Sequence, residues 1–127
     1  MAHYFTLEEA NAAVLVIRPI LEEIQIIRKH ILDKQPEVWP VIEKAAGNGG
    51  SQAASRLAQS FERLDALVHQ IQDMGAILKD INSGLLDFPA WREDHEVYLC
   101  WHLGEGRIAF WHEIEDGFAG RQPIDML

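Results

Sequence analysis

The chain has 127 residues, 48% of them hydrophobic, and its 20 acidic and 11 basic side chains give a formal net charge of −9. This acidity disfavours nucleic acid and anionic membranes as partners, because both are bound through clustered lysine and arginine. The length and apolar content suit one folded domain over residues 1–127, and a single cysteine with no long apolar run predicts a cytoplasmic protein without disulfides or membrane spans.

The first predicted element is a long helix that begins after Thr6. Thr6 and Glu9 have the spacing of a capping box, and apolar residues then recur every three or four positions up to Ile31. Pro36 ends the helix. A second apolar stripe widens the face beyond what one partner helix covers, so we expect a homodimer with helices packed across a two-fold axis. That stripe consists of Ala13, Val16, Ile20 and Ile27.

A second long helix is predicted from about Ser51 to about Ile81, with Gly75 in its interior. Residues 47–50 (Gly-Asn-Gly-Gly) precede it and read as a linker, since the lysine and strand of a phosphate-binding loop are missing. The two helices together predict an antiparallel helical hairpin over residues 6–83.

After Gly84 the hydrophobic period changes from 3.6 to 2, which is typical of strands. Three short strands are predicted, over residues 85–88, 96–103 and 107–113, with a glycine-rich turn at 104–106. The fold class is therefore α+β, with a three-stranded antiparallel meander and a tail over residues 84–127 packed on the helical hairpin.

The turn between the last two strands decides which side chains share a face. With an even number of loop residues, Leu103 faces Ile108 and one face becomes almost wholly apolar. With an odd number, Cys100, His102 and His112 lie together, as zinc or copper ligands would. We expect the even register, because a sheet packed on helices needs an apolar face, and the odd register is the alternative.

The acidic charge is concentrated in the second half of the chain. Residues 1–64 hold seven basic and eight acidic side chains, whereas residues 65–127 hold four basic and twelve acidic ones, which makes −1 against −8. The second half also contains the only cysteine and four of the six histidines. No cofactor belongs to the main prediction, and the alternative is a divalent cation, zinc or similar, held in this half. Candidate metal ligands are His112, Glu113, Cys100, Asp80 and Asp87. Each also has a structural alternative, as a buried histidine, a packed thiol or a carboxylate that caps a turn.

Arg121 follows two glycines in residues 117–123 and is a candidate anion-binding residue. The alternative is that Arg121 pairs with a nearby carboxylate while Phe118 anchors the tail. No catalytic triad, His-Glu-x-x-His or Cys-x-x-Cys spacing is present, so no catalytic residue is assigned.

An ordered series of short motifs spans nearly the whole chain and resembles the bacterial domain-of-unknown-function family 2203. The series consists of 6–11 (Thr-Leu-Glu-Glu-Ala-Asn), 47–50 (Gly-Asn-Gly-Gly), 75–80 (Gly-Ala-Ile-Leu-Lys-Asp), 84–89 (Gly-Leu-Leu-Asp-Phe-Pro), 97–101 (Val-Tyr-Leu-Cys-Trp), 103–105 (Leu-Gly-Glu), 110–113 (Phe-Trp-His-Glu) and 117–123 (Gly-Phe-Ala-Gly-Arg-Gln-Pro). The resemblance implies a small bacterial cytoplasmic protein and supplies no catalytic residue. Family members often carry a basic residue where this chain has His102, which implies His112, Glu113 and Cys100 as the better ligand candidates.

These features predict a non-enzymatic, oligomeric interaction module that presents its acidic second half to a protein partner. The alternative is a metal-binding protein or metal-assisted enzyme with its site near His112 and Glu113. Neither function involves nucleic acid or a membrane.

Overall fold

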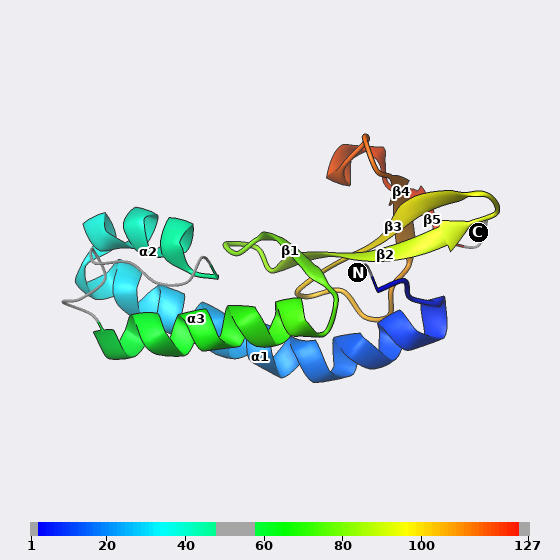
Figure 1. Ribbon diagram of the computed structural model, residues 1–127. Helices are drawn as coiled ribbons and strands as arrows, with labels where there is room; N and C mark the ends of the chain where they lie inside the picture. Colours follow the sequence, from blue (N-terminus) through cyan, green and yellow to red (C-terminus); the bar gives the residue numbers. More distant parts are fainter. Residues whose placement is uncertain (1–2, 48–57, 125–127) are drawn as a thin grey trace.

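Helices form the first half of the chain and an antiparallel sheet forms most of the second half (Figure 1). The computed structural model describes residues 3–47 and 58–124. The helices are α1 (Leu7–Lys34), η1 (Pro36–Val38), α2 (Trp39–Ala45), α3 (Ala58–Asp73) and η3 (Phe118–Gly120). The strands are β1 (Ile77–Asp80), β2 (Leu85–Arg92), β3 (His95–His102), β4 (Phe110–Glu113) and β5 (Gln122–Pro123). The α+β class is confirmed. Within the described residues, no helix has the length and hydropathy that crossing a bilayer would require.

Helix α1 begins and ends where its sequence predicts. The Thr6 hydroxyl accepts a hydrogen bond from the Glu9 amide at 3.0 Å, and the Glu9 carboxylate accepts one from the Thr6 amide at 2.8 Å. The capping box therefore satisfies two amides that the first helical turn leaves without partners. One side of α1 is buried along its length. It consists of Ala10, Ala13, Val14, Ile17, Leu21, Ile24 and Ile31.

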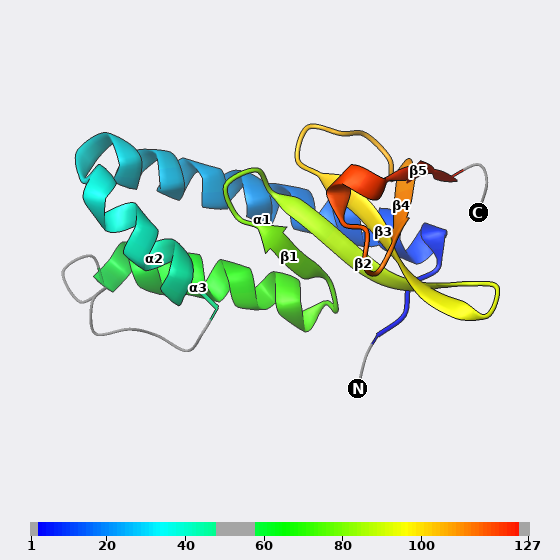
Figure 2. The ribbon, with the colours of Figure 1, turned by 90° about the horizontal axis from the view of Figure 1, so that it is seen from above.

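Helices α1 and α3 lie side by side and antiparallel, as the predicted helical hairpin requires (Figures 1 and 2). Arg63 on α3 binds Glu23 on α1 through two hydrogen bonds, of 2.5 and 2.7 Å. This exposed ion pair fixes the alignment of the helices more than it stabilises them. The predicted helix start near Ser51 and residues 48–50 of the glycine-rich linker lie outside the described residues.

The second helix is shorter than predicted, because α3 ends at Asp73 instead of near Ile81. Gly75 has φ +93°, a left-handed conformation that stops the helix, and a Cβ there would lie 2.9 Å from the Cβ of His3. The following residues form strand β1, in which Ile77 pairs with Asp87 of β2. Pairing with the edge of a sheet therefore prevails over the helical spacing of these apolar residues.

The sheet has five strands in the order β1-β2-β3-β4-β5, all antiparallel, instead of the three predicted. Strand β2 continues through Pro89, where the sequence predicted its end. Pro89 donates no backbone hydrogen bond, but its carbonyl accepts one from the Phe5 amide at 2.8 Å. The Pro89 nitrogen therefore points away from β3, toward the part of the β2 edge with which β1 does not pair. A proline is tolerated there because no strand needs its missing amide hydrogen.

The expected even register of the last hairpin is wrong. Tyr98 pairs with His112, Leu99 with Trp111 and Cys100 with Phe110, which is the odd register. The connection between β3 and β4 spans residues 103–109, so no tight turn sets the register. Ile108 lies outside the strands and its amide binds the Asn11 side chain on α1.

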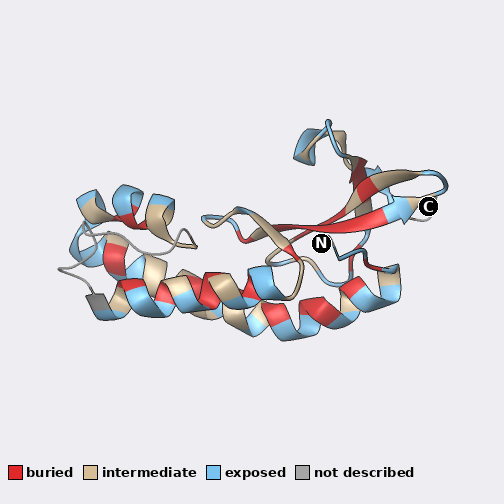
Figure 3. Ribbon diagram, in the orientation of Figure 1, coloured by how far each residue is buried: buried red, intermediate tan, exposed pale blue. Residues whose placement is uncertain are grey.

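Many residues of the central strands are buried (Figure 3), and the strand pairing places buried residues on both faces of the sheet. The inner face packs on the buried stripe of α1 in a single hydrophobic core. It consists of Leu86, Phe88, Ala90, Val97, Leu99, Trp101 and Trp111. The residues that alternate with these along β2, β3 and β4, among them Asp87, Cys100 and His112, lie on the outer face. The short helix η3 lies on that side of the sheet (Figures 1 and 2). The two faces explain the wrong register, since the prediction assumed that only one face was covered.

Candidate functional site

Three polar side chains converge on the outer face of the sheet, one from each central strand. Asp87 on β2 pairs directly with Cys100 on β3, and His112 lies on the neighbouring β4. The distance between Asp87 Oδ1 and His112 Nε2 is 2.9 Å, and one ligand atom from each of the three residues lies within 4.8 Å of the others. All three residues are buried, with at most 2% of their surface exposed. We call this group the Asp87 cluster.

The hydrogen bonds of His112 fix the orientation of its ring. Its Nδ1 lies 2.7 Å from the Glu113 carbonyl oxygen, which can only accept, so Nδ1 carries a proton. Its Nε2 then points at the Asp87 carboxylate. A histidine held through Nδ1 by a backbone carbonyl, with Nε2 directed at other ligands, has the arrangement of a metal-binding histidine.

Cys100 is a protonated thiol in the metal-free protein. Burial, followed by the negative charge of Asp87, raises the pKa of the Cys100 thiol to about 12. The thiol hydrogen-bonds to the Asp87 carboxylate, and both nitrogens of His112 are engaged elsewhere. A cysteine nucleophile needs a thiolate and a free base beside it, so this geometry does not support nucleophilic catalysis.

The Asp87 cluster offers one sulfur, one nitrogen and one carboxylate oxygen, a donor set that suits zinc. Zinc binds such atoms at about 2.0–2.3 Å, which separates tetrahedral ligand atoms by roughly 3.2–3.8 Å. The observed spacing therefore needs only small side-chain movements. No further Asp, Glu, His or Cys of the described residues joins the group, so side chains of these types would fill three of the four positions around a tetrahedral ion.

The segment from Phe118 to Arg121 lies against the same part of the sheet. The Arg121 guanidinium lies 4.1 Å from the Phe110 ring centroid and 4.6 Å from that of Phe118. Its Nη2 donates to both carboxylate oxygens of Glu105 at 2.8 Å. The predicted alternative for Arg121, pairing with a carboxylate, is thus the arrangement present, and Glu105 takes the place that an external anion would need.

The other predicted metal ligands are not part of the Asp87 cluster. Glu113 points away from it and accepts a hydrogen bond from His95 at 2.9 Å. Asp80 caps the turn after β1, where it binds the Asn82 amide and the Ser83 hydroxyl. His102, the third member of the predicted odd-register group, hydrogen-bonds to the Leu103 carbonyl. The sequence named all three members of the cluster and predicted that their strands pair, but it did not give the register that places Asp87 opposite Cys100.

Comparison with known proteins gives a family and no characterised relative. Neither a curated protein nor a solved structure matches the chain. The family model described as "Uncharacterized conserved protein (DUF2203)" matches residues 3–124, which is nearly the whole chain and confirms the resemblance seen in its motifs. The chain therefore belongs to the DUF2203 family of uncharacterized conserved proteins.

Proposed function

We propose that the chain is a non-enzymatic zinc-binding protein whose ion is held by Asp87, Cys100 and His112. The observation that carries this proposal is the convergence of three buried donor atoms of different type within 4.8 Å. Binding would replace the thiol proton of Cys100 and place the ion between Nε2 of His112 and the Asp87 carboxylate.

The cost of the Asp87 cluster to the fold supports a functional reading. Buried polar groups are expensive even when paired, and apolar side chains of similar volume would pack the same space at least as well. Asp87 and His112 are each 2% exposed, in a sheet whose other central residues are largely apolar. A zinc ion would turn this cost into a link across β2, β3 and β4, and would stabilise the sheet on which the acidic second half is displayed.

The proposal is tested by titrating metal-free protein with Co²⁺, which reports a thiolate ligand through a sulfur-to-metal absorption band, and with Zn²⁺ in competition. We expect one ion per chain, confirmed by native mass spectrometry. The variants Cys100→Ser, Asp87→Asn and His112→Gln should each weaken binding by at least about tenfold.

Matched controls come from the two predicted ligands outside the cluster. Glu113→Gln and Asp80→Asn remove carboxylates from the same part of the chain and should leave metal binding unchanged. Circular dichroism in chelator confirms that each variant is folded. Asp87→Asn is the most informative of them, because its amide can donate to His112 Nε2 and so keep the local hydrogen bond. Loss of binding in both controls, or no binding by the unaltered protein, would refute the proposal.

We also propose that α1 mediates self-association into a homodimer. Ile26 is 69% exposed and Val16 is 54% exposed, so the outward side of α1 carries apolar residues that none of the described residues covers. The acidic first turn of α1 contains Glu8 and Glu9, and its last turn contains Lys34. An antiparallel second copy would bring opposite charges together at both ends. Of the predicted second stripe, Val16 is exposed, whereas Ala13 is buried and Ile20 and Ile27 pack partly on the core.

Sedimentation velocity at micromolar concentration tests this association. We expect a dimer that Ile26→Lys converts to a monomer, since a charge on the apolar side of α1 would be buried in the interface. Ile114→Lys is the control, because Ile114 is an exposed apolar residue outside α1. A monomeric unaltered protein would refute the dimer without bearing on the metal site.

A further inference from the structure

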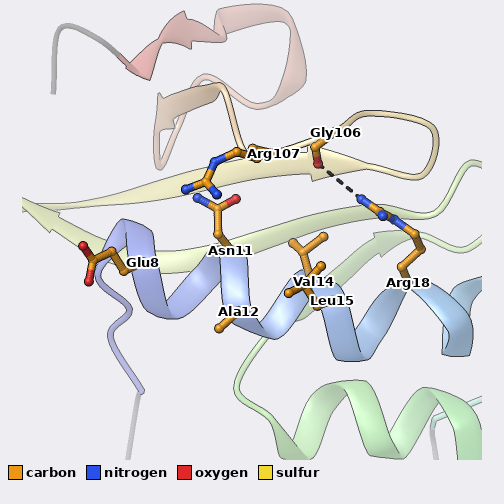
Figure 4. Close-up of a pocket in the computed structure, with 8 residues that line it drawn as sticks. All are labelled: Glu8, Asn11, Ala12, Val14, Leu15, Arg18, Gly106 and Arg107. Atoms are coloured by element: carbon orange, nitrogen blue, oxygen red, sulfur yellow. Dashed lines mark hydrogen bonds between the residues drawn. The ribbon is translucent and has the colours of Figure 1, made fainter.

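A groove lies between the first half of α1 and the connection from β3 to β4 (Figure 4). Its volume is about 470 Å³, within the range of small-molecule sites. Asn11, Val14, Leu15 and Arg18 line it from the helix, and Arg107 lines it from the connection. The groove shares no residue with the Asp87 cluster, so its role does not depend on a metal ion.

Asn11 places an unused donor in this groove. Its Oδ1 accepts a hydrogen bond from the Ile108 amide at 2.8 Å, and a backbone amide can only donate. This bond fixes which end of the Asn11 amide is oxygen, and leaves Nδ2 on the other side. Asn11 Nδ2 is buried and has no hydrogen-bond partner. A buried donor without an acceptor costs free energy, so an acceptor is the group this position lacks.

The Arg107 guanidinium supplies the charge that such an acceptor would need. In Figure 4 the guanidinium of Arg107 and the amide of Asn11 point toward one another. Both are donors, so neither satisfies the other. Across residues 3–47 and 58–124, no ion pair or hydrogen bond involves the Arg107 side chain. Two planar donor groups that face each other without an acceptor match the two oxygens of a carboxylate.

The remaining lining residues limit the charge and the shape of the ligand. Arg18 adds a second positive charge and is held in place by the Glu105 and Gly106 carbonyls at 3.5 and 3.4 Å. Glu8 subtracts one charge, so the groove carries +1 and favours a monoanion over a phosphate dianion. The Leu15 side chain, which is 69% exposed, offers an apolar surface beside the donors.

We propose that this groove binds a short-chain aliphatic monocarboxylate. The carboxylate lies between Asn11 Nδ2 and the Arg107 guanidinium, and the aliphatic chain covers Leu15. The ligand would also bridge α1 to the 103–109 connection, adding to the link that Asn11 already makes with Ile108.

The probe for this site is hexanoate, and the readout is the side-chain amide signal of Asn11 together with the backbone signals of residues 106–108 in ¹⁵N–¹H spectra. We expect these signals to shift saturably with hexanoate. Asn11→Asp keeps the oxygen that accepts from Ile108 but replaces the donor with a negative charge. It should weaken binding on the order of tenfold or more, and so should Arg107→Gln. Lys34→Gln removes one exposed charge from the far end of α1 and should leave the affinity unchanged.

Four results would overturn the proposal. Absence of a saturable shift would exclude the site, and equal shifts with hexan-1-ol would show that the groove binds apolar chains without reading the carboxylate. Inorganic phosphate that displaced hexanoate at equal concentration would contradict the preference for a monocarboxylate. If Lys34→Gln weakened hexanoate binding as much as Arg107→Gln does, the effect would come from the overall charge of the protein and not from the groove. None of these results depends on zinc, so the two proposals fail separately.

Discussion

Replacing His112 with phenylalanine tests whether the buried polar side chains of the Asp87 cluster depend on one another for hydrogen bonds that water cannot replace. The substitution keeps a ring of similar shape but removes the Nε2 that lies 2.9 Å from Asp87 Oδ1. Asp87 is 2% exposed, so water cannot replace the lost partner. Removing His112 leaves the buried Asp87 carboxylate without this hydrogen bond, which costs about 3 kcal/mol of unfolding free energy. For a chain of this length, that corresponds to a melting temperature lower by roughly 10 °C or more.

The double variant Asp87→Val/His112→Phe separates polar loss from packing loss. Removing both partners eliminates the carboxylate that the single variant leaves without its histidine, so we expect the free energy of unfolding to return to within about 2 kcal/mol of the original protein, or to exceed it. Urea unfolding in chelator, followed by the fluorescence of the buried Trp101 and Trp111, measures all three proteins. The free energies can be compared when the three proteins show the same slope of unfolding free energy against urea concentration.

Two outcomes would refute this reasoning. A loss below about 1 kcal/mol in His112→Phe would mean that water or another donor reaches Asp87. A double variant no more stable than the single one would assign the loss to ring packing against Tyr98, whose ring centroid lies 5.6 Å from that of His112. A double variant that recovers stability but binds no metal would show that the cluster is kept for a purpose other than stability.

Three further predictions follow from individual contacts. Thr6→Ala should lower the unfolding free energy by about 1 kcal/mol in chemical denaturation, because it removes one half of the capping box. His95 should titrate above its usual 6.5 in an NMR pH series, since hydrogen bonding to Asp94 and attraction to Glu113 raise its pKa. The stabilisation from His95 is present below that usual value and is lost as the pH rises through the raised one. Glu113→Gln should lower the measured pKa of His95, and an unchanged value would contradict the pairing. Cys100 should resist iodoacetamide in the folded, metal-free protein and react once urea unfolds it, because the thiol is buried and its pKa is about 12. Rapid labelling of the folded protein would disprove the burial.

The first helix could be predicted almost completely, because its signals are local. Thr6 and Glu9 are three residues apart, and the buried side from Ala10 to Ile31 follows the helical period. Such features need no knowledge of the rest of the fold. The start and end of α1 were therefore correct.

The predictions failed where distant segments compete for the same residues. Ile77 and Leu78 continue the helical spacing of α3, yet they pair with β2 once the left-handed Gly75 has turned the chain. The predicted register of β3 and β4 was wrong for a related reason. The glycines at 104 and 106 lie within a seven-residue connection instead of a tight hairpin turn, so they do not fix the register. The rule of one apolar face does not apply to a sheet covered on both sides. Only the sheet could show that Asp87 lies opposite Cys100.

The acidic charge of the second half of the chain can be related to the structure by comparing the two faces of the sheet. The inner face is apolar and packs on α1, so it stabilises the fold by ordinary burial. The outer face buries Asp87, Cys100 and His112, a set whose burial opposes folding unless something compensates. A divalent cation offers that compensation, and an acidic surrounding favours its approach. A bound ion would thus turn a set of residues whose burial costs free energy in the metal-free chain into a stabilising link between strands.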